Sequence, residues 1–137
     1  MPTIRQMTTL IEEHLGREAA GDAAGAVAVY THDVQHDVVG SPMGVLTGPD
    51  AAQRFYEHLI NDLKIENMVM VRDWFGSDFA VMEHIVDAAV AGSFMGIPGH
   101  GRSIRFRMLH VWEFRDGKIS RENVWLDGGA IAAQLTS

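Results

Sequence analysis

Apolar residues recur at three- and four-residue spacing in two long segments, which predicts amphipathic helices over residues 4–20 and 51–63. The first stripe consists of Ile4, Met7, Leu10, Ile11 and Leu15. The second consists of Ala52, Phe55, Tyr56, Leu59, Ile60 and Leu63. Between them, Asp22 is expected to cap a short helix that runs to Tyr30. The β-branched residues of 34–39 indicate a strand, and residues 40–48 a loop.

The second half of the chain predicts two hairpins. Residues 66–75 and 79–93 flank Gly76-Ser77-Asp78, and residues 103–115 and 118–127 flank Asp116-Gly117. Residues 92–102 are expected to form a glycine-rich loop, and residues 130–135 a closing helix. This order of elements indicates one α+β domain over residues 1–137, with helices packed on one face of a curved, mainly antiparallel sheet.

The Asp116-Gly117 turn fixes which residues of the last hairpin should lie opposite one another. In a two-residue turn, Arg115 lies opposite Lys118, and the same count places Trp112 opposite Arg121. Because side chains alternate along a strand, one face would then carry Phe106, Met108, His110, Trp112, Phe114, Ile119, Arg121, Asn123, Trp125 and Asp127. The other face alternates charged residues with Leu and Val, which suits solvent or a contact between two sheets.

The mixed composition of the first face has two interpretations. A mostly apolar surface with a few polar groups is typical of a small-molecule cavity. The same polar groups could instead find partners inside a filled core, with Arg121 at a wet rim. We favour the cavity, with ligand contacts from Asn123, Arg121, Trp125, Met108, Phe106 and Trp112.

Two residues of this face could transfer protons. Asp127 would be desolvated among Phe106, Met108 and Trp125, and desolvation raises a carboxyl pKa towards the range useful for general acid or base catalysis. Asp127 could equally cap the C-terminal helix. His110 could exchange protons or polarise a carbonyl. This register separates His110 from Asp127 by about 13 Å, so that a substrate would lie between them.

Two histidines in the first strand raise the question of a metal site. His32 and His36 are each followed by Asp, and on a helix they would share a face that could bind zinc. The valines around them favour a strand instead, so no metal site is expected. His36 is expected to face the cavity as a third catalytic candidate, or else to be a core histidine.

Three further residues are candidates for ligand contact. Glu83 shares one strand face with Asp87, and the sequence leaves open whether that face points inward. If that face points inward, Glu83 would supply a second acid. Phe55 and Tyr56 would form either core or cavity wall.

Charge and composition narrow the classes of partner. Eleven Lys+Arg against eighteen Asp+Glu give a formal net charge of −7. This balance argues against a nucleic-acid or anionic-membrane partner, because phosphate binding needs a basic patch. The chain has no cysteine, which excludes disulfides and thiolate chemistry. Residues 1–11 lack the apolar run of a signal peptide, and no stretch reaches about 20 apolar residues, so a cytoplasmic protein is expected.

The glycine-rich loop resembles a family motif. Phe94-Met95-Gly96-Ile97-Pro98-Gly99-His100-Gly101-Arg102 is similar to the F-x-G-I-P-x-x-G-R/K loop of SnoaL-like polyketide cyclases. In that family a strand, the motif F-x-D-G-K-I and a later Asp follow, and Phe114-Arg115-Asp116-Gly117-Lys118-Ile119 and Asp127 match them. The resemblance covers roughly residues 5–135. It departs at Arg121-Glu122-Asn123, where the family often has Glu-His-Trp.

The resemblance implies a fold and a range of activities. The family belongs to the nuclear transport factor 2-like superfamily, which implies a cone-shaped, cystatin-like roll. In that roll the N-terminal helices pack on the concave face of a curved antiparallel sheet around an apolar cavity, commonly in a homodimer. It implies no metal and no organic cofactor. In the cyclases, the Asp that matches Asp127 serves as acid/base for an aldol ring closure, while other superfamily members isomerise steroids, dehydrate phenolic ketones or open epoxides.

We therefore expect a cofactor-independent acid/base enzyme of the cyclase, isomerase or dehydratase (lyase) type. Its substrate would be a small hydrophobic molecule that is cyclic or bears a carbonyl. Asp127 would be the acid/base, and His110, His36 and Asn123 would orient or polarise the substrate. The rival enzyme class is an epoxide hydrolase that uses Arg121, Asp127 and Glu83. The competing non-catalytic class is a module that binds a small ligand or dimerises. A homodimer through the outer sheet face is the expected assembly.

Overall fold

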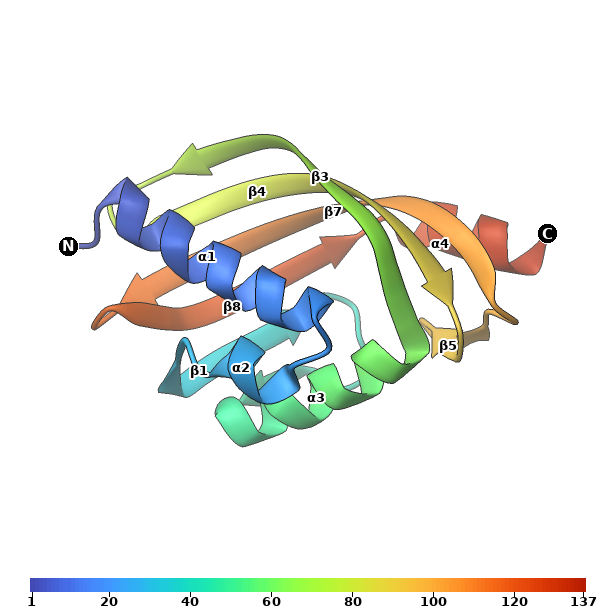
Figure 1. The fold of residues 1–137 in the computed structure, drawn as a ribbon, viewed down its shortest axis with the longest axis horizontal. Coiled ribbons are helices and arrows are strands. Elements are labelled where there is room, and N and C mark those ends of the chain that lie inside the picture. Colours follow the sequence, from blue (N-terminus) through green and yellow to red (C-terminus); the bar gives the residue numbers. More distant parts are fainter.

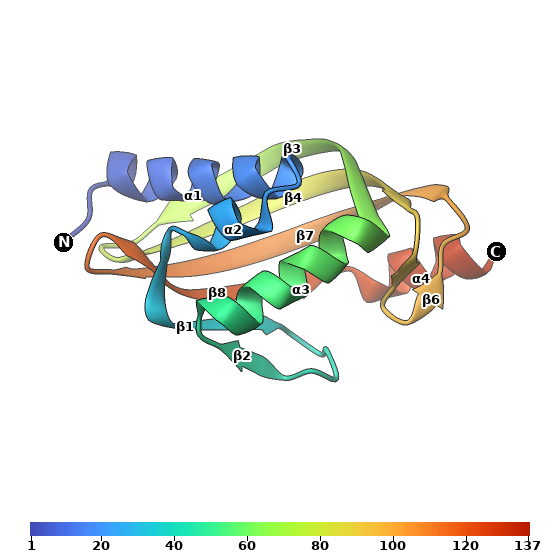
Figure 2. The same ribbon diagram turned by 60° about the horizontal axis from the view of Figure 1, so that its bottom comes forward.

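A computed structural model describes residues 1–137 and shows a strongly curved sheet whose concave side is covered by helices (Figures 1 and 2). The sheet has six strands in the order β2-β1-β8-β7-β4-β3. The helices are α1 (Ile4–Ala19), α2 (Ala23–Val27), α3 (Pro49–Asp62) and α4 (Gly128–Thr136). The strands are β1 (Tyr30–Val38), β2 (Val45–Thr47), β3 (Leu63–Phe75), β4 (Phe79–Val90), β5 (Ser93–Phe94), β6 (Ile97–Pro98), β7 (Arg102–Arg115) and β8 (Lys118–Leu126).

The predicted α+β class and its curved sheet are confirmed, with one addition to the strand pairing. The strands β3, β4, β7 and β8 pair antiparallel in chain order, as the two hairpin signals predict. The first strand, β1, pairs parallel to β8, so the sheet is mixed. Parallel pairing requires the chain to cross over between strands. The predicted loops also contain short strands, since β2 lies within residues 40–48 and the β5–β6 pair within residues 92–102.

Caps fix the helices that cover the concave face. Thr3 and Gln6 form a capping box at the start of α1. Asp22 caps α2 by accepting a hydrogen bond from the Gly25 amide. Gly48 precedes α3 with a φ of 89°, a conformation that favours glycine, and Pro49 occupies the first helical turn.

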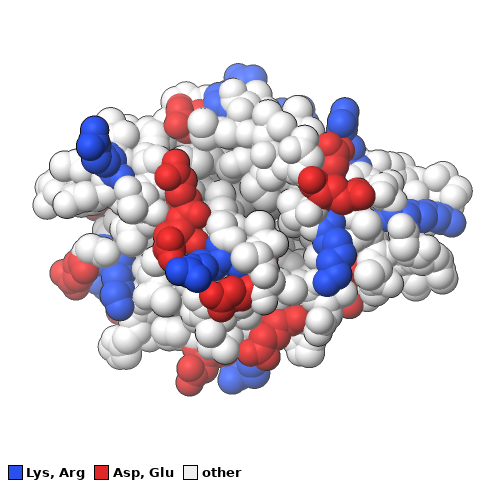
Figure 3. All heavy atoms as spheres, in the orientation of Figure 1, with Lys and Arg blue, Asp and Glu red and all other residues white.

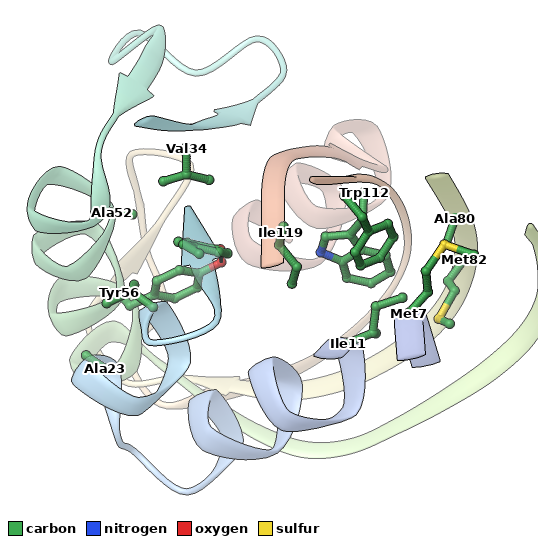
Figure 4. Close-up of a cluster of buried hydrophobic side chains, with 13 residues drawn as sticks. Met7, Ile11, Ala23, Val34, Ala52, Tyr56, Ala80, Met82, Trp112 and Ile119 are labelled. Carbon is green, nitrogen blue, oxygen red and sulfur yellow. Dashed lines mark hydrogen bonds between the residues drawn. The ribbon is translucent and has the colours of Figure 1, made fainter. Parts of the chain in front are cut away.

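The core has two apolar clusters along the length of the sheet. One cluster packs α1, α2 and α3 against the sheet, and Figure 4 shows Met7 and Ile11 of α1 pointing toward Trp112 of β7. The other cluster lies beneath α4 at the opposite end of the molecule, where Ile131 and Leu135 pack with Phe106.

A bulge changes the register of the last hairpin. Asp116 and Gly117 both have positive φ, as a two-residue type I′ turn requires, and Arg115 lies opposite Lys118 as predicted. The register then shifts, so that Glu113 lies opposite Arg121 and Ser120 is the extra residue. An extra residue reverses the alternation of every residue beyond it. The predicted inner face is therefore correct along β7 and wrong along β8 from Arg121 onward.

The outer face of the sheet combines apolar and charged residues. Register places an apolar patch on this face, with Val69, Trp74 and Trp125 each at least 41% exposed. The other patch members are Val81, Ile85, Leu109 and Val111. Figure 3 shows the opposite side of the molecule, where α1 and α2 lie in front of the sheet in Figure 1; acidic and basic side chains are interspersed there, with no continuous basic area. No helix is both long and apolar enough to cross a membrane.

Candidate active site

Glu122 of β8 is the centre of a buried polar cluster. Its carboxylate is 1% exposed, and three neutral donors reach it. The Tyr30 hydroxyl donates to Oε1 at 2.8 Å, the Trp112 indole N–H donates to Oε1 at 2.9 Å, and the Tyr56 hydroxyl donates to Oε2 at 3.0 Å. Because a carboxylate only accepts hydrogen bonds, each of these three groups must direct its O–H or N–H toward Glu122.

His14 of α1 supplies the charge that balances Glu122. Its Nε2 lies 3.1 Å from Glu122 Oε1, and its Nδ1 lies 2.7 Å from the carbonyl oxygen of Ala26. Since both nitrogens meet acceptors, the ring must carry both protons. Burial lowers the pKa of His14, but the charge of Glu122 and its hydrogen bond outweigh burial and raise that pKa to about 9. Burial likewise favours the neutral form of Glu122, yet His14 and His36 hold the pKa of Glu122 well below its usual range.

His36 of β1 and His110 of β7 complete the cluster on its cavity side. The Nε2 of each ring lies 3.6 Å from Glu122 Oε2, and His36 Nε2 is also 3.0 Å from the Tyr56 hydroxyl. Because the Tyr56 hydroxyl donates its hydrogen bond to Glu122, His36 Nε2 must donate to the Tyr56 oxygen. The Nδ1 atoms of both rings are buried and have no hydrogen-bond partner. Burial lowers the pKa of His110 to about 4, so this ring is neutral at pH 7.

A cavity of about 510 Å³ opens beside this cluster. It is lined by 24 residues, 16 of them hydrophobic, which matches the size and polarity of small-molecule sites. Its polar walls include His36, His110, Glu122 and Glu18. Residues 39–43, after β1, and residues 94–96, from the end of β5 to the turn before β6, add lining that includes the exposed Met43 and Met95.

Six of the predicted site residues line this cavity. They are His36, Phe55, Tyr56, Phe106, Met108 and His110. Trp112 is fully buried beside the cavity and hydrogen-bonds to Glu122, so it supports the site without lining it. The sequence therefore predicted correctly which β7 residues face the concave side.

The other predicted site residues lie outside the cavity. Asp127 is exposed and caps α4, accepting a hydrogen bond from the Ala130 amide at 3.2 Å, so its expected desolvation is wrong. Arg121, Asn123 and Trp125 are on the outer face, and Arg121 Nε donates to Asn123 Oδ1 at 3.0 Å. The bulge at Ser120 is the physical reason, because it reverses the face of each of these residues.

Glu83 is also outside the cavity. It lies opposite Leu109 on the outward face of β4 and pairs with Arg72 at 3.2 Å and Arg107 at 3.0 Å. The expectation of Glu83 as a ligand contact is therefore wrong. Its neighbours His84 and Met82 take the inward positions.

Sequence reasoning missed three ionisable residues of the site, which are Glu122, His14 and Glu18. The register of the turn places Glu122 among the charged residues of the outer face, because the turn motif carries no sign of the bulge. His14 did leave a signal, because it continues the buried stripe of Met7 and Ile11 on α1. A polar residue on the apolar stripe of a helix needs a buried partner, so it points to a polar cluster. No group of three or more His, Cys, Asp and Glu side chains is arranged to hold a metal ion.

Comparison with known proteins places this geometry in a family. The family model described as SnoaL-like polyketide cyclase matches residues 8–135. No curated protein sequence matches the chain significantly.

Solved structures share the fold at low sequence identity. A candidate polyketide cyclase from a Silicibacter species is 20% identical, with a TM-score of 0.83 and 100% of both chains covered. A candidate polyketide cyclase from Xanthomonas campestris pv. campestris is 18% identical, with a TM-score of 0.81, covering 96% of this chain and 97% of that one. An LEH-like epoxide hydrolase from M. tuberculosis is 14% identical, with a TM-score of 0.77, covering 98% of this chain and 92% of that one. Together with the family match over nearly the whole sequence, these likenesses show that the chain belongs to the SnoaL-like polyketide cyclase family.

Proposed function

We propose that the protein is an acid/base enzyme that moves a proton on a small, mainly apolar molecule held in the cavity. The reaction would be a cyclisation, isomerisation or dehydration, and the substrate would be cyclic or bear a carbonyl. Proton transfer of this kind requires a positioned base and a water-poor pocket, and it requires no cofactor. A family that includes polyketide cyclases supports this class of reaction.

One observation carries the proposal, namely the free Nδ1 atoms of His36 and His110. Each ring directs its Nε2 toward Glu122 or Tyr56, and its Nδ1 is buried without a hydrogen-bond partner, so a substrate reaches Nδ1 only when the ring turns at the cavity wall. An oriented neutral imidazole whose far nitrogen faces a carboxylate is a competent general base, because the imidazolium it becomes is stabilised. We assign the base role to His36 and the role of second acceptor to His110.

The base role falls to His36 because of the contrast between the two rings. Burial lowers the pKa of His110 to about 4, so this ring can accept a hydrogen bond but binds a proton weakly. His36 is bonded to Tyr56, which in turn is bonded to Glu122, so a proton gained at Nδ1 is compensated through this chain. Phe55 packs on the His36 ring at a centroid distance of 4.8 Å and fixes its plane.

The epoxide hydrolase alternative loses its expected residues. Arg121, Asp127 and Glu83 all lie outside the cavity, and none of the cavity-lining residues is an arginine. The likeness to an epoxide hydrolase structure is a likeness of fold at 14% identity. The remaining alternative is a non-catalytic module that binds a ligand, and experiment must distinguish it from an enzyme.

The test begins with steroids, aromatic polyketides, terpenes and epoxides screened for a rise in Tm. Molecules that bind are then incubated with the protein in D2O, and mass spectrometry measures deuterium incorporation and product formation. His36→Gln should lower the rate about 10²- to 10⁴-fold, the usual contribution of a general base, while binding persists. An unchanged rate in His36→Gln would remove this base from the mechanism, and binding without exchange or product would favour the binding module.

We also propose that two copies of the chain associate through the outer sheet face. The patch of Val69, Trp74, Val81, Ile85, Leu109, Val111 and Trp125 supports this assembly, because a contiguous exposed apolar area is uncommon on monomers. Charged pairs on the same face, such as Arg105 with Asp87 at 2.7 Å, give that surface a polar rim.

A further inference from the structure

Glu18, near the end of α1, lies between two separate hollows of the molecule. Its side chain lines the main cavity and also a second pocket of about 220 Å³. The second pocket is bounded by residues 19–21 on one side and by residues of α3 and β3 on the other. Ala19, Ala20, Gly21 and Lys64 are exposed, so this pocket is open to the surface.

Glu18 is also in contact with the buried cluster. Its Oε2 lies 3.9 Å from His14 Nε2, which lies 3.1 Å from Glu122 Oε1. The side chain of Glu18 is 16% exposed, whereas those of His14 and Glu122 are 0% and 1% exposed. Of the two carboxyl groups that line the main cavity, Glu18 is therefore the one that also reaches solvent.

The charges that face Glu18 leave both of its protonation states accessible at neutral pH. They are His14 on its own helix, Glu122 on β8, His36 on β1 and, across the second pocket, Lys64 on β3. Burial is the largest influence and raises the pKa of Glu18, His14 opposes the rise, and the negative charge of Glu122 adds to it, for a pKa of about 7.

We propose that Glu18 is the group that exchanges protons between water at the second pocket and the main cavity. A protonated Glu18 gives its proton to an anion formed in the cavity, and its carboxylate is then reprotonated by hydronium or a buffer acid in the water of the second pocket. The reverse order removes a proton from the cavity. The use of this path in catalysis rests on the proposed function, because a base such as His36, which is 1% exposed, must otherwise wait for product release to exchange its proton.

This path of proton exchange through Glu18 can be tested in the free protein without any substrate. In ¹⁵N-histidine-labelled protein, NMR measures how fast the His14 Nε2 proton exchanges with water. Glu18 Oε2 lies 3.9 Å from His14 Nε2, so the Glu18 side chain must move closer before its carboxylate takes this proton and returns another. Glu18→Gln should therefore slow the exchange at least about tenfold. Glu18→Asp keeps a carboxyl and should restore part of the rate. Glu12→Gln, an exposed site on the same helix, should leave the rate unchanged.

A second variant guards against a folding defect in Glu18→Gln. Ile60→Trp fills the second pocket while keeping the carboxyl, and it should also slow the exchange. Wild-type exchange rates in both variants would overturn the path. If the wild type turns over no ligand but Glu18→Gln slows the exchange, the path is supported and the proposed function fails. If Glu18→Gln loses turnover but keeps the wild-type exchange rate, the path fails and the proposed function is supported. With a substrate in hand, Glu18→Gln should lower kcat with little change in KM and remove the pH dependence near 7.

Discussion

Glu122 lies directly opposite Trp112 in the last hairpin and accepts the indole N–H at 2.9 Å. The turn alone would place Arg121 in that position. The bulge at Ser120 exchanges a cation for an anion on the concave side and so creates the centre of the site. One extra residue thereby decides whether the cavity contains a carboxylate or an arginine.

Deletion of Ser120 is expected to leave Glu122 in the buried cluster. Without the extra residue, Arg121 still lies opposite Glu113 and Glu122 opposite Trp112, so the strand only loses its bulge.

Insertion of one alanine between Arg121 and Glu122 should instead abolish the cooperative fold. It turns Glu122 outward and leaves the His14 imidazolium unpaired, and burial of an unpaired charge costs several kcal/mol of a total stability of about 5–15 kcal/mol. Urea unfolding and near-UV circular dichroism check both expectations. Ser120→Ala should change the unfolding free energy by less than about 0.5 kcal/mol. A folded insertion variant, or an unfolded deletion variant, would contradict this register.

Glu122→Gln is expected to destabilise the protein by about 3–5 kcal/mol, because it leaves the His14 imidazolium buried without a counter-charge. Urea unfolding at pH 7 measures the change. Glu113→Gln is the matched control on the neighbouring strand. The Glu113 side chain is 54% exposed, and its Oε2 forms only a long ion pair with Arg121 Nε, at 4.0 Å. The control should stay within about 0.5 kcal/mol of the wild type. Equal effects in the two variants would contradict the central role of Glu122.

The stability that His14 contributes should disappear as the pH rises through 9. The folded protein binds the His14 proton more tightly, with a pKa of about 9 against 6.5, so the contribution is complete below pH 6.5. The pKa difference corresponds to about 3 kcal/mol. Urea unfolding from pH 7.5 to 10 should therefore show a steeper loss in the wild type than in His14→Gln. Parallel curves for the two proteins would mean that His14 is not the titrating group.

Asp127 should matter for stability and not for chemistry. Asp127→Asn keeps a good helix cap, so turnover and Tm should both stay close to wild type. Asp127→Ala removes the bond to the Ala130 amide and should cost about 1 kcal/mol of unfolding free energy with turnover unchanged. A loss of turnover in Asp127→Asn, at unchanged stability, would return this residue to the mechanism.

The proposed dimer predicts the effect of a charge on the outer face. Val69, 51% exposed in the apolar patch, would be buried against a second copy, so Val69→Lys should halve the mass measured by sedimentation at micromolar concentration. Met43→Lys is the control, because Met43 is 57% exposed but lies beside the cavity. A wild-type protein that sediments as a monomer at this concentration would end the proposal.

The predictable part of the site came from local rules. The spacing of Met7 and Ile11 predicted α1, and Asp116-Gly117 predicted both the last turn and the pairing of Arg115 with Lys118. Alternation along β7 then predicted that Phe106, Met108 and His110 share the concave face, where they line the cavity. His36 was placed by the same alternation in β1.

The unpredicted part depended on contacts between residues far apart in the chain. Whether Ser120 bulges is decided by packing against β1 and the helices, which favours Ile119 and Glu122 both inward, and no turn motif records that preference. His14, Tyr30, Tyr56 and Trp112 come from four different elements and meet only around Glu122.

The long helices, the two hairpins and the apolar side of β7 follow from local rules, because propensity, capping and turn chemistry act over a few residues. Tertiary structure alone decided which carboxylate is buried, since the burial of an ion depends on whether distant donors and a counter-charge converge on it. Here they converge on Glu122, and Asp127 remains in solvent as a helix cap.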